Sequence, residues 1–101
     1  MDKAEGDVVV EEGDEGDFFY IIERGSVDCV KRLEGGGEKH IRTLFEGDGF
    51  GEKALISPSQ KRTLTVRAKT SCRLLALDKS RFERILGAIQ NYLEGKYNAY
   101  G

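Results

Sequence analysis

A short stretch of this 101-residue chain combines residue types and spacings that suit an anionic ligand. Gly49 and Gly51 flank Phe50, and since neither glycine carries a Cβ, the backbone can approach a ligand closely there. A helical turn is predicted near residues 53–55, and the N–H groups that open such a turn favour a negative charge. This stretch is therefore a candidate anion site.

Two charged side chains complete the candidate site. Arg62 stands ten residues after Glu52 and can offer a planar guanidinium, whose paired N–H groups suit a phosphate. An ionised Glu52 can only accept hydrogen bonds, so it suits a hydroxyl donor and not a phosphate. A ligand with one phosphate and one free sugar hydroxyl fits this set. Taken singly, Glu52 would be better explained as a surface turn acid and Arg62 as a solvated arginine.

The order of these groups resembles the phosphate-binding cassette of cyclic nucleotide-binding domains. The similarity lies in two runs, FGEKAL at residues 50–55 and RTLT at residues 62–65, where Leu64 replaces the small residue usual in the family. The turn glycines of the family also have counterparts, at Gly6-Asp7, Gly13–Asp17, Gly25–Val27 and Gly47-Asp48. The resemblance therefore covers nearly the whole chain, from about Gly6 to Tyr100.

The resemblance implies a role for each residue of the cassette. Glu52 would accept a hydrogen bond from the ribose 2′-hydroxyl, and Arg62 would pair with the cyclic phosphate. The backbone N–H groups of Gly51 and Ala54 would lie beside Arg62, and Lys53 belongs to the same ligand-binding turn. The chain would bind a cyclic nucleotide without catalytic residues, a metal or a cofactor.

The choice between the two purine cyclic nucleotides depends on two other positions. Thr63 follows Arg62 where cAMP-selective members usually carry alanine, and its hydroxyl could bond the guanine amine. Arg42 stands where cGMP-selective members place an arginine, which offers two donors to guanine O6 and N7, and its neighbour Ile41 is included in the predicted site. Because two positions agree, cGMP is favoured over cAMP. The alternatives are a plain strand residue for Thr63 and a solvated arginine for Arg42.

A residue of the C-terminal helix often caps the base in this family. Tyr100 is the predicted cap and Tyr97 its competitor, unless these tyrosines merely cover the barrel or fray at the terminus. Ligand docking would change the contacts of Leu55 and Ile56 with the helix that carries Phe82. Movement of that helix would relay binding to the rest of the protein.

The cassette most resembles those of cGMP-dependent protein kinases. The implied function is a cGMP-binding regulatory domain of such a serine/threonine kinase, with the catalytic domain and neighbouring regulatory domains as partners. The alternative is the cAMP-binding domain of a cAMP-dependent kinase regulatory subunit, which the run RFERILG at residues 81–87 also resembles. A docking or dimerisation β-roll without nucleotide is disfavoured by Glu52 and Arg62, and a metal-dependent β-barrel enzyme by the lone His40.

Short β-branched and aromatic runs separated by Gly/Asp turns predict the elements that hold the cassette. The predicted strands are 8–10, 18–22, 27–31, 40–44, 63–68 and 73–77, with a hairpin loop at 34–38. The run 18–22 indicates burial on both faces, and 63–68 alternates between Thr/Arg and apolar positions. With the resemblance, this predicts an α+β, mainly β fold, an eight-stranded antiparallel β-roll (a jelly-roll-like barrel) with a short cassette helix and C-terminal helices.

A helical period follows Asp78, a plausible N-cap. Apolar residues that share one helical face stand at positions 82, 85, 86, 89 and 93. Gly87 should divide this segment into two helices, because glycine costs about 1 kcal/mol relative to alanine within a helix. One domain, residues 1–101, would therefore contain a β-roll at about 6–77, the cassette at 50–65 and helices at 78–100.

Composition argues against several other functions. The formal net charge of −2, from 16 basic and 18 acidic residues, provides no broad surface for nucleic acid or anionic membrane. No apolar run reaches membrane-spanning length, and the first residues lack an apolar signal core. Cys29 and Cys72 have no metal-ligand spacing and should be buried free thiols, consistent with a cytoplasmic location.

Overall fold

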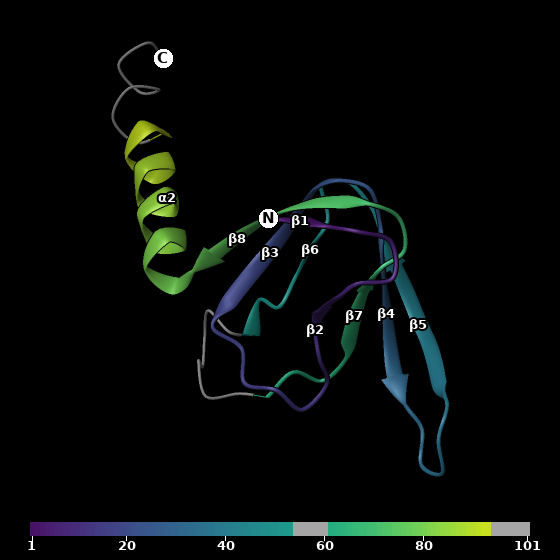
Figure 1. Cartoon of the computed structure of the whole chain (residues 1–101). Helices are drawn as coiled ribbons and strands as arrows, with labels where there is room; N and C mark the ends of the chain where they lie inside the picture. Colours follow the sequence, from purple (N-terminus) through teal and green to yellow (C-terminus); the bar gives the residue numbers. More distant parts are fainter. Residues whose placement is uncertain (54–60, 94–101) are drawn as a thin grey trace.

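Two four-stranded antiparallel sheets form the body of the molecule (Figure 1). The computed structural model describes residues 1–53 and 61–93. The first sheet has the order β1 (Asp2–Lys3), β8 (Cys72–Asp78), β3 (Phe18–Arg24) and β6 (Gly49–Phe50). The second has the order β2 (Val8–Val10), β7 (Thr65–Ala68), β4 (Val27–Arg32) and β5 (Glu38–Leu44). The predicted mainly β fold, an eight-stranded antiparallel β-roll, is confirmed.

The six strands predicted from hydrophobic patterning are all present, with shifted ends. The sequence does not predict β1 or β6, because two residues are too short to show a period. β7 begins at Thr65 instead of Thr63, since Thr63 and Leu64 form a bend. Thr65 is only 2% exposed. Its buried hydroxyl accepts a hydrogen bond of 3.0 Å from the Glu12 backbone N–H.

Side chains from both sheets meet in one hydrophobic core. Ile22 and Leu74 of the first sheet are 1% exposed, and Val27 of the second is fully buried. Tyr20 stacks on Phe50 with 5.1 Å between ring centroids. Because Phe50 is the first residue of the cassette, this stacking connects the core directly to the candidate site.

In the described part of the chain, one helix follows the sheets. α2 (Lys79–Asn91) begins after Asp78, whose side chain accepts a hydrogen bond of 2.7 Å from the Arg81 backbone N–H, so the predicted N-cap is confirmed. The prediction that Gly87 divides this segment is wrong, because α2 continues through it. A glycine costs about 1 kcal/mol within a helix, whereas a break there would give up several consecutive backbone hydrogen bonds.

The outer face of β3 meets the first turn of α2. Phe19 and Phe82 pack edge to face there, with 6.0 Å between ring centroids. The prediction that β3 is buried on both faces is wrong: Tyr20 and Ile22 on one face are buried, but Phe19 and Ile21 on the other face are only half-buried. β3 therefore has one core face and one face that α2 covers in part.

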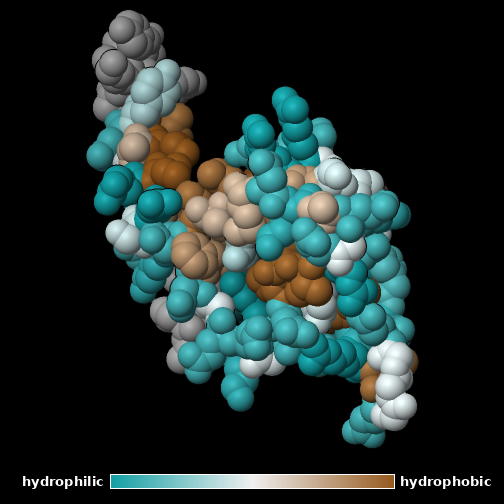
Figure 2. Space-filling model, in the orientation of Figure 1, coloured by the Kyte–Doolittle hydropathy of each residue, from teal (hydrophilic) through white to brown (hydrophobic). Residues whose placement is uncertain are grey.

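Beyond its first turn, α2 leaves the roll and presents an apolar face (Figure 1). Figure 2 shows hydrophobic side chains along the side of the helix that looks toward the roll. The exposed large apolar residues of α2 are Ile85, Leu86 and Ile89, which are between 44% and 51% exposed, and Leu93 follows the helix. The contact predicted between this helix and Leu55 and Ile56 involves residues outside the described part of the chain.

The core can be tested by removing one of its side chains. Leu74→Ala should lower the free energy of unfolding by about 2–5 kcal/mol, because it deletes a buried side chain and leaves a cavity. Leu33→Ala removes the same atoms from a side chain that is 48% exposed beyond β4, and should cost less than about 1 kcal/mol. Denaturant unfolding followed by circular dichroism measures both values. Equal losses in the two variants would contradict this description of the core.

Candidate functional site

A cavity of about 220 Å³ lies between the start of the cassette, β4, β5 and the segment that precedes β7. It is lined by Val10, Gly16, Cys29, Arg42, Leu44, Gly49, Phe50, Gly51, Glu52, Lys53, Lys61, Arg62, Thr63, Leu64 and Val66. Six residues of the predicted ligand-binding set are among them: Gly51, Glu52, Lys53, Arg62, Thr63 and Arg42. The fold thus brings residues from three separate segments to one cavity.

Among the described residues, one predicted site residue is absent from the cavity lining. Ile41 is not among the lining residues, and its side chain is 43% exposed, so its part in ligand binding stays a prediction. Successive side chains of β5 point to opposite faces, so Ile41 faces away when Arg42 faces the cavity. Ala54, Tyr97 and Tyr100 lie outside the residues that the structure describes.

The Arg62 side chain is held in place by protein contacts. Its Nη2 donates a hydrogen bond of 2.7 Å to the Phe18 backbone carbonyl, and its guanidinium lies 5.9 Å from the centre of the Tyr20 ring. Gly16 and Gly51 lie against the same guanidinium, and a Cβ at either position would overlap it. Two glycines therefore make the space that the Arg62 fork occupies.

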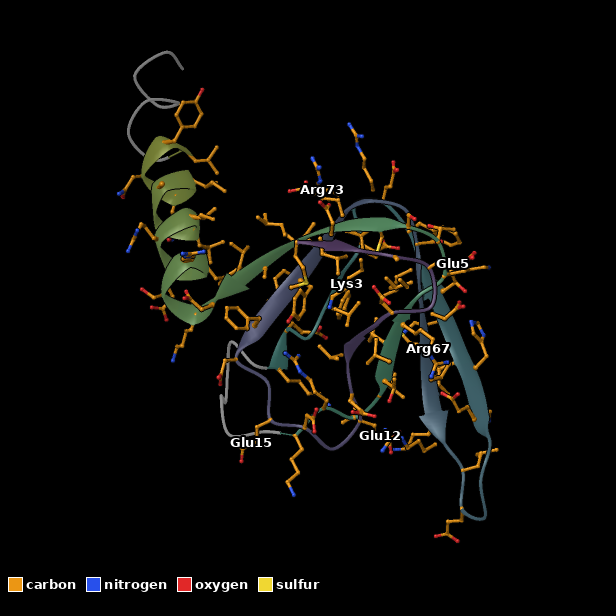
Figure 3. All side chains as sticks on the ribbon, in the orientation of Figure 1. Lys3, Glu5, Glu12, Glu15, Arg67 and Arg73 are labelled. Atoms are coloured by element: carbon orange, nitrogen blue, oxygen red, sulfur yellow. The ribbon has the colours of Figure 1, made fainter. Side chains whose placement is uncertain are left out.

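The Arg62 backbone is held by the acidic loop, which we define as residues 11–17 between β2 and β3. The Arg62 N–H donates to the Asp14 carbonyl at 2.7 Å, and the Gly13 N–H donates to the Arg62 carbonyl at 2.8 Å. One residue earlier, Lys61 pairs with Glu15 in an isolated antiparallel bridge. Figure 3 labels Glu15 and Glu12 along the loop at the lower edge of the roll. This loop therefore supports the segment that carries Arg62.

The cassette turn adds a carboxylate and a cationic side chain. Gly51 has a φ of +84°, a conformation that side-chain-bearing residues rarely adopt. Glu52 and Lys53 follow with exposed side chains. The turn thus places a carboxylate and an ammonium group in the lining of one cavity.

Thr63 and Arg42 approach the cavity from two different elements. Thr63 is exposed in the bend before β7, directly after Arg62. Arg42 lies on β5, opposite Cys29 of β4 in the strand register. The half-buried Leu64, which replaces the usual small residue of the cassette, packs against the hydrophobic core. Leu64 therefore anchors the bend without removing a polar group from the cavity.

The charge of the cavity differs from that of the whole chain. Arg42, Lys53, Lys61 and Arg62 line it together with one carboxylate, that of Glu52. The formal net charge of the chain, in contrast, is −2. The site is therefore a local concentration of cationic groups that would attract a small anion.

The cavity offers binding groups and no activated nucleophile among the described residues. Burial raises the pKa of the Cys29 thiol, which therefore stays neutral and unreactive. Cys29 and Cys72 are both buried and free, as predicted. Within residues 1–53 and 61–93, no group of three or more His, Cys, Asp or Glu side chains could hold a metal ion.

Three contributors to the site are missing from the sequence-based prediction: Gly16, the Phe18 carbonyl and the Tyr20 ring. Gly16 belongs to the run GDEGD and is expected only as a turn glycine. Its second role depends on the approach of Arg62, which is 46 residues away along the chain. Every residue has a backbone carbonyl, so the residue types cannot show that the carbonyl of Phe18 accepts from Arg62.

Comparison with known proteins agrees with this geometry. The family profile described as a cyclic nucleotide-binding domain matches residues 3–88. The chain belongs to the cyclic nucleotide-binding domain family. The family membership predicted from the cassette is therefore confirmed.

Two relatives of this cyclic nucleotide-binding domain come from protein kinase systems. The cAMP-dependent protein kinase regulatory subunit of Blastocladiella emersonii is 41% identical over 97 residues, which cover 96% of this chain and 24% of that protein. Human cGMP-dependent protein kinase 2 is 35% identical over 94 residues, covering 89% of this chain and 12% of that protein. The chain thus spans a quarter or less of the length of these relatives.

A solved structure has the same fold as this cyclic nucleotide-binding domain. The co-crystal structure of the regulatory domain of Toxoplasma gondii PKA with cAMP superposes with a TM-score of 0.75 at 33% identity. The alignment covers 99% of this chain and 38% of that one. In the described part of the present domain, no helix is both long and apolar enough to cross a membrane.

The Arg62 fork can be tested without removing its charge. Arg62→Lys should weaken binding of cGMP and cAMP alike by about tenfold or more, because lysine cannot make the paired hydrogen bonds of a guanidinium. Isothermal titration calorimetry measures both affinities. The control is Arg73→Lys, at an exposed arginine whose ion pair with Asp2 measures 3.1 Å. Affinities unchanged by Arg62→Lys, or lowered equally by Arg73→Lys, would contradict a phosphate-binding role for the fork.

Proposed function

We propose that this domain binds a purine cyclic nucleotide, prefers cGMP, and regulates a cGMP-dependent serine/threonine protein kinase of which it is a part. The observation that carries the proposal is that two possible base readers, Arg42 and Thr63, line the same cavity as Glu52 and Arg62. Residues suited to phosphate, ribose and base are thus present together. The proposed location is the cytoplasm, which suits the buried free thiols of Cys29 and Cys72.

In the proposed complex, the phosphate and the ribose of the ligand contact different residues of the cavity. The cyclic phosphate pairs with the Arg62 guanidinium and with N–H groups of the cassette turn at Gly51, Lys53 and Ala54. Glu52 accepts a hydrogen bond from the ribose 2′-hydroxyl, because an ionised carboxylate cannot donate. These contacts are the same for cGMP and cAMP, so they determine affinity and not selectivity.

Selectivity would come from Arg42 and Thr63. The two nucleotides differ at purine positions 2 and 6. Thr63 follows Arg62 directly, so a ligand whose phosphate meets Arg62 brings its base near the Thr63 hydroxyl, which can accept from the guanine amine. Arg42 reaches the cavity from β5 and can donate to guanine O6 and N7. A paired contact of this kind is worth about 1–3 kcal/mol of discrimination against another base.

The route from the site to the rest of the protein is proposed to run through α2. Its exposed apolar face, which includes Ile85 and Leu86, would bury more surface if the helix closed over the roll. Ligand binding would favour the closed arrangement, with Tyr100, or its competitor Tyr97, covering the base. The kinase catalytic domain and neighbouring regulatory domains are the proposed partners. The match to human cGMP-dependent protein kinase 2 supports this part of the proposal.

The second candidate function is a cAMP-binding domain of a cAMP-dependent protein kinase regulatory subunit. It is supported by the relative from Blastocladiella emersonii, whose identity of 41% exceeds the 35% of the human cGMP-dependent kinase. Under this candidate, Arg62 and Glu52 keep their roles. Arg42 and Thr63 then become ordinary exposed strand and bend residues.

Calorimetric titration of the domain with cGMP and with cAMP separates the two candidates. The proposal predicts tighter binding of cGMP, and Thr63→Ala should lower cGMP affinity by about fivefold to tenfold while cAMP affinity stays unchanged. Arg42→Ala should have the same selective effect, because it removes donors that only guanine uses. Binding of cAMP is the internal control, since it tests the phosphate and ribose contacts in each variant. Equal or reversed preference in the unmodified domain would favour the second candidate.

A further inference from the structure

Lys31 reaches across the second sheet to the backbone of Thr63. It lies near the end of β4, and its Nζ donates to the Thr63 carbonyl at 3.2 Å. The same Nζ donates to Oε2 of Glu12 at 3.1 Å. One ammonium group thus connects the acidic loop to the bend that carries Thr63.

Glu12 is itself held from three directions. Its Oε1 accepts from the Arg32 backbone N–H at 3.0 Å, and its own N–H donates to the Thr65 hydroxyl at 3.0 Å. The Arg32 N–H and the Lys31 ammonium lower the pKa of the Glu12 carboxyl below its usual value, so the carboxylate is ionised at neutral pH. Its side chain is 19% exposed. Glu12 is therefore a well-anchored acceptor for Lys31.

We infer that Lys31 is a positioning residue for base selectivity: held by Glu12, its ammonium holds the Thr63 carbonyl and so directs the Thr63 hydroxyl into the cavity. This inference rests on the proposed function, in which Thr63 reads the guanine amine. Lys31 is not itself a cavity-lining residue. It acts through the backbone of Thr63, which does line the cavity.

Loss of the Lys31 ammonium should affect only recognition of the base, because other residues hold Arg62 in place. Its backbone is paired with Asp14 and Gly13, and its Nη2 is held by the Phe18 carbonyl. Lys31 makes none of these hydrogen bonds. Loss of the Lys31 ammonium would therefore loosen Thr63 while it leaves the phosphate-binding fork in place.

The test is the Lys31→Met variant, which removes the ammonium and keeps an unbranched side chain. Calorimetry should show a loss of cGMP affinity of about threefold to tenfold, with cAMP affinity unchanged within about twofold. Arg32→Met is the matched control. It removes the same charge from the next residue of β4, whose side chain pairs with Glu11 and not with Thr63, so both affinities should stay unchanged.

A double-mutant cycle completes the test. In a Thr63→Ala background, Lys31→Met should alter neither affinity, because the hydroxyl that Lys31 directs is absent. Equal loss of cGMP and cAMP binding in Lys31→Met would overturn the inference, since it would indicate a general charge effect. An unchanged cGMP affinity would also overturn it, because Lys31 would then form only a surface ion pair. If Thr63→Ala alone leaves cGMP affinity unchanged, the proposed base reading fails, and the inference fails with it for that separate reason.

Discussion

The candidate site depends on one short backbone contact, between the acidic loop and the segment that carries Arg62. Two hydrogen bonds join Arg62 to Asp14 and Gly13, and neighbouring contacts extend the pairing from Lys61 to Thr65. Without these hydrogen bonds, the Arg62 backbone, which lies just before the bend at Thr63 and Leu64, would have no partner. The direction of the Arg62 side chain would then be undefined. With these hydrogen bonds, the guanidinium sits between two glycines with its Nη2 on the Phe18 carbonyl. The cost of ordering a long side chain is thus met during folding, before a ligand binds.

This arrangement also explains how an acidic chain can contain an anion site. The acidic loop contributes its backbone to Arg62, while two of its carboxylates pair with other cations: Glu11 with Arg32, and Glu12 with Lys31. The cavity itself is lined mainly by cationic side chains. Selectivity and affinity are then separable in structural terms. The fork of Arg62 and the carboxylate of Glu52 suit groups common to all purine cyclic nucleotides, whereas Arg42 and Thr63, which line the same cavity, are the proposed readers of the base.

Much of this could be predicted from the sequence, because it depends on local patterns. Short β-branched and aromatic runs between Gly/Asp turns predicted six strands, and Asp78 predicted the start of α2. The FGEKAL and RTLT runs predicted Glu52, Arg62 and Thr63, which line the cavity. What could not be predicted depends on contacts between distant segments. The Thr65 hydroxyl accepts a hydrogen bond from Glu12, Gly16 lies against the Arg62 guanidinium, and Lys31 donates to the Thr63 carbonyl. The prediction of a break at Gly87 was wrong because it used local propensity alone. The cost of a glycine within a helix, about 1 kcal/mol, is smaller than the cost of the backbone hydrogen bonds that a break in α2 would lose.

The central claim is that Arg62 is already held in the position in which it meets the phosphate. The most direct measurement is a crystal structure of the domain with cGMP bound, compared with the domain crystallised alone. The account predicts that Arg62 keeps its hydrogen bond to the Phe18 carbonyl in both, with the phosphate against the guanidinium, Glu52 on the ribose, and the guanine edge between Arg42 and Thr63. A guanidinium that leaves the space between Gly16 and Gly51 to reach the phosphate, or a nucleotide bound elsewhere, would contradict it.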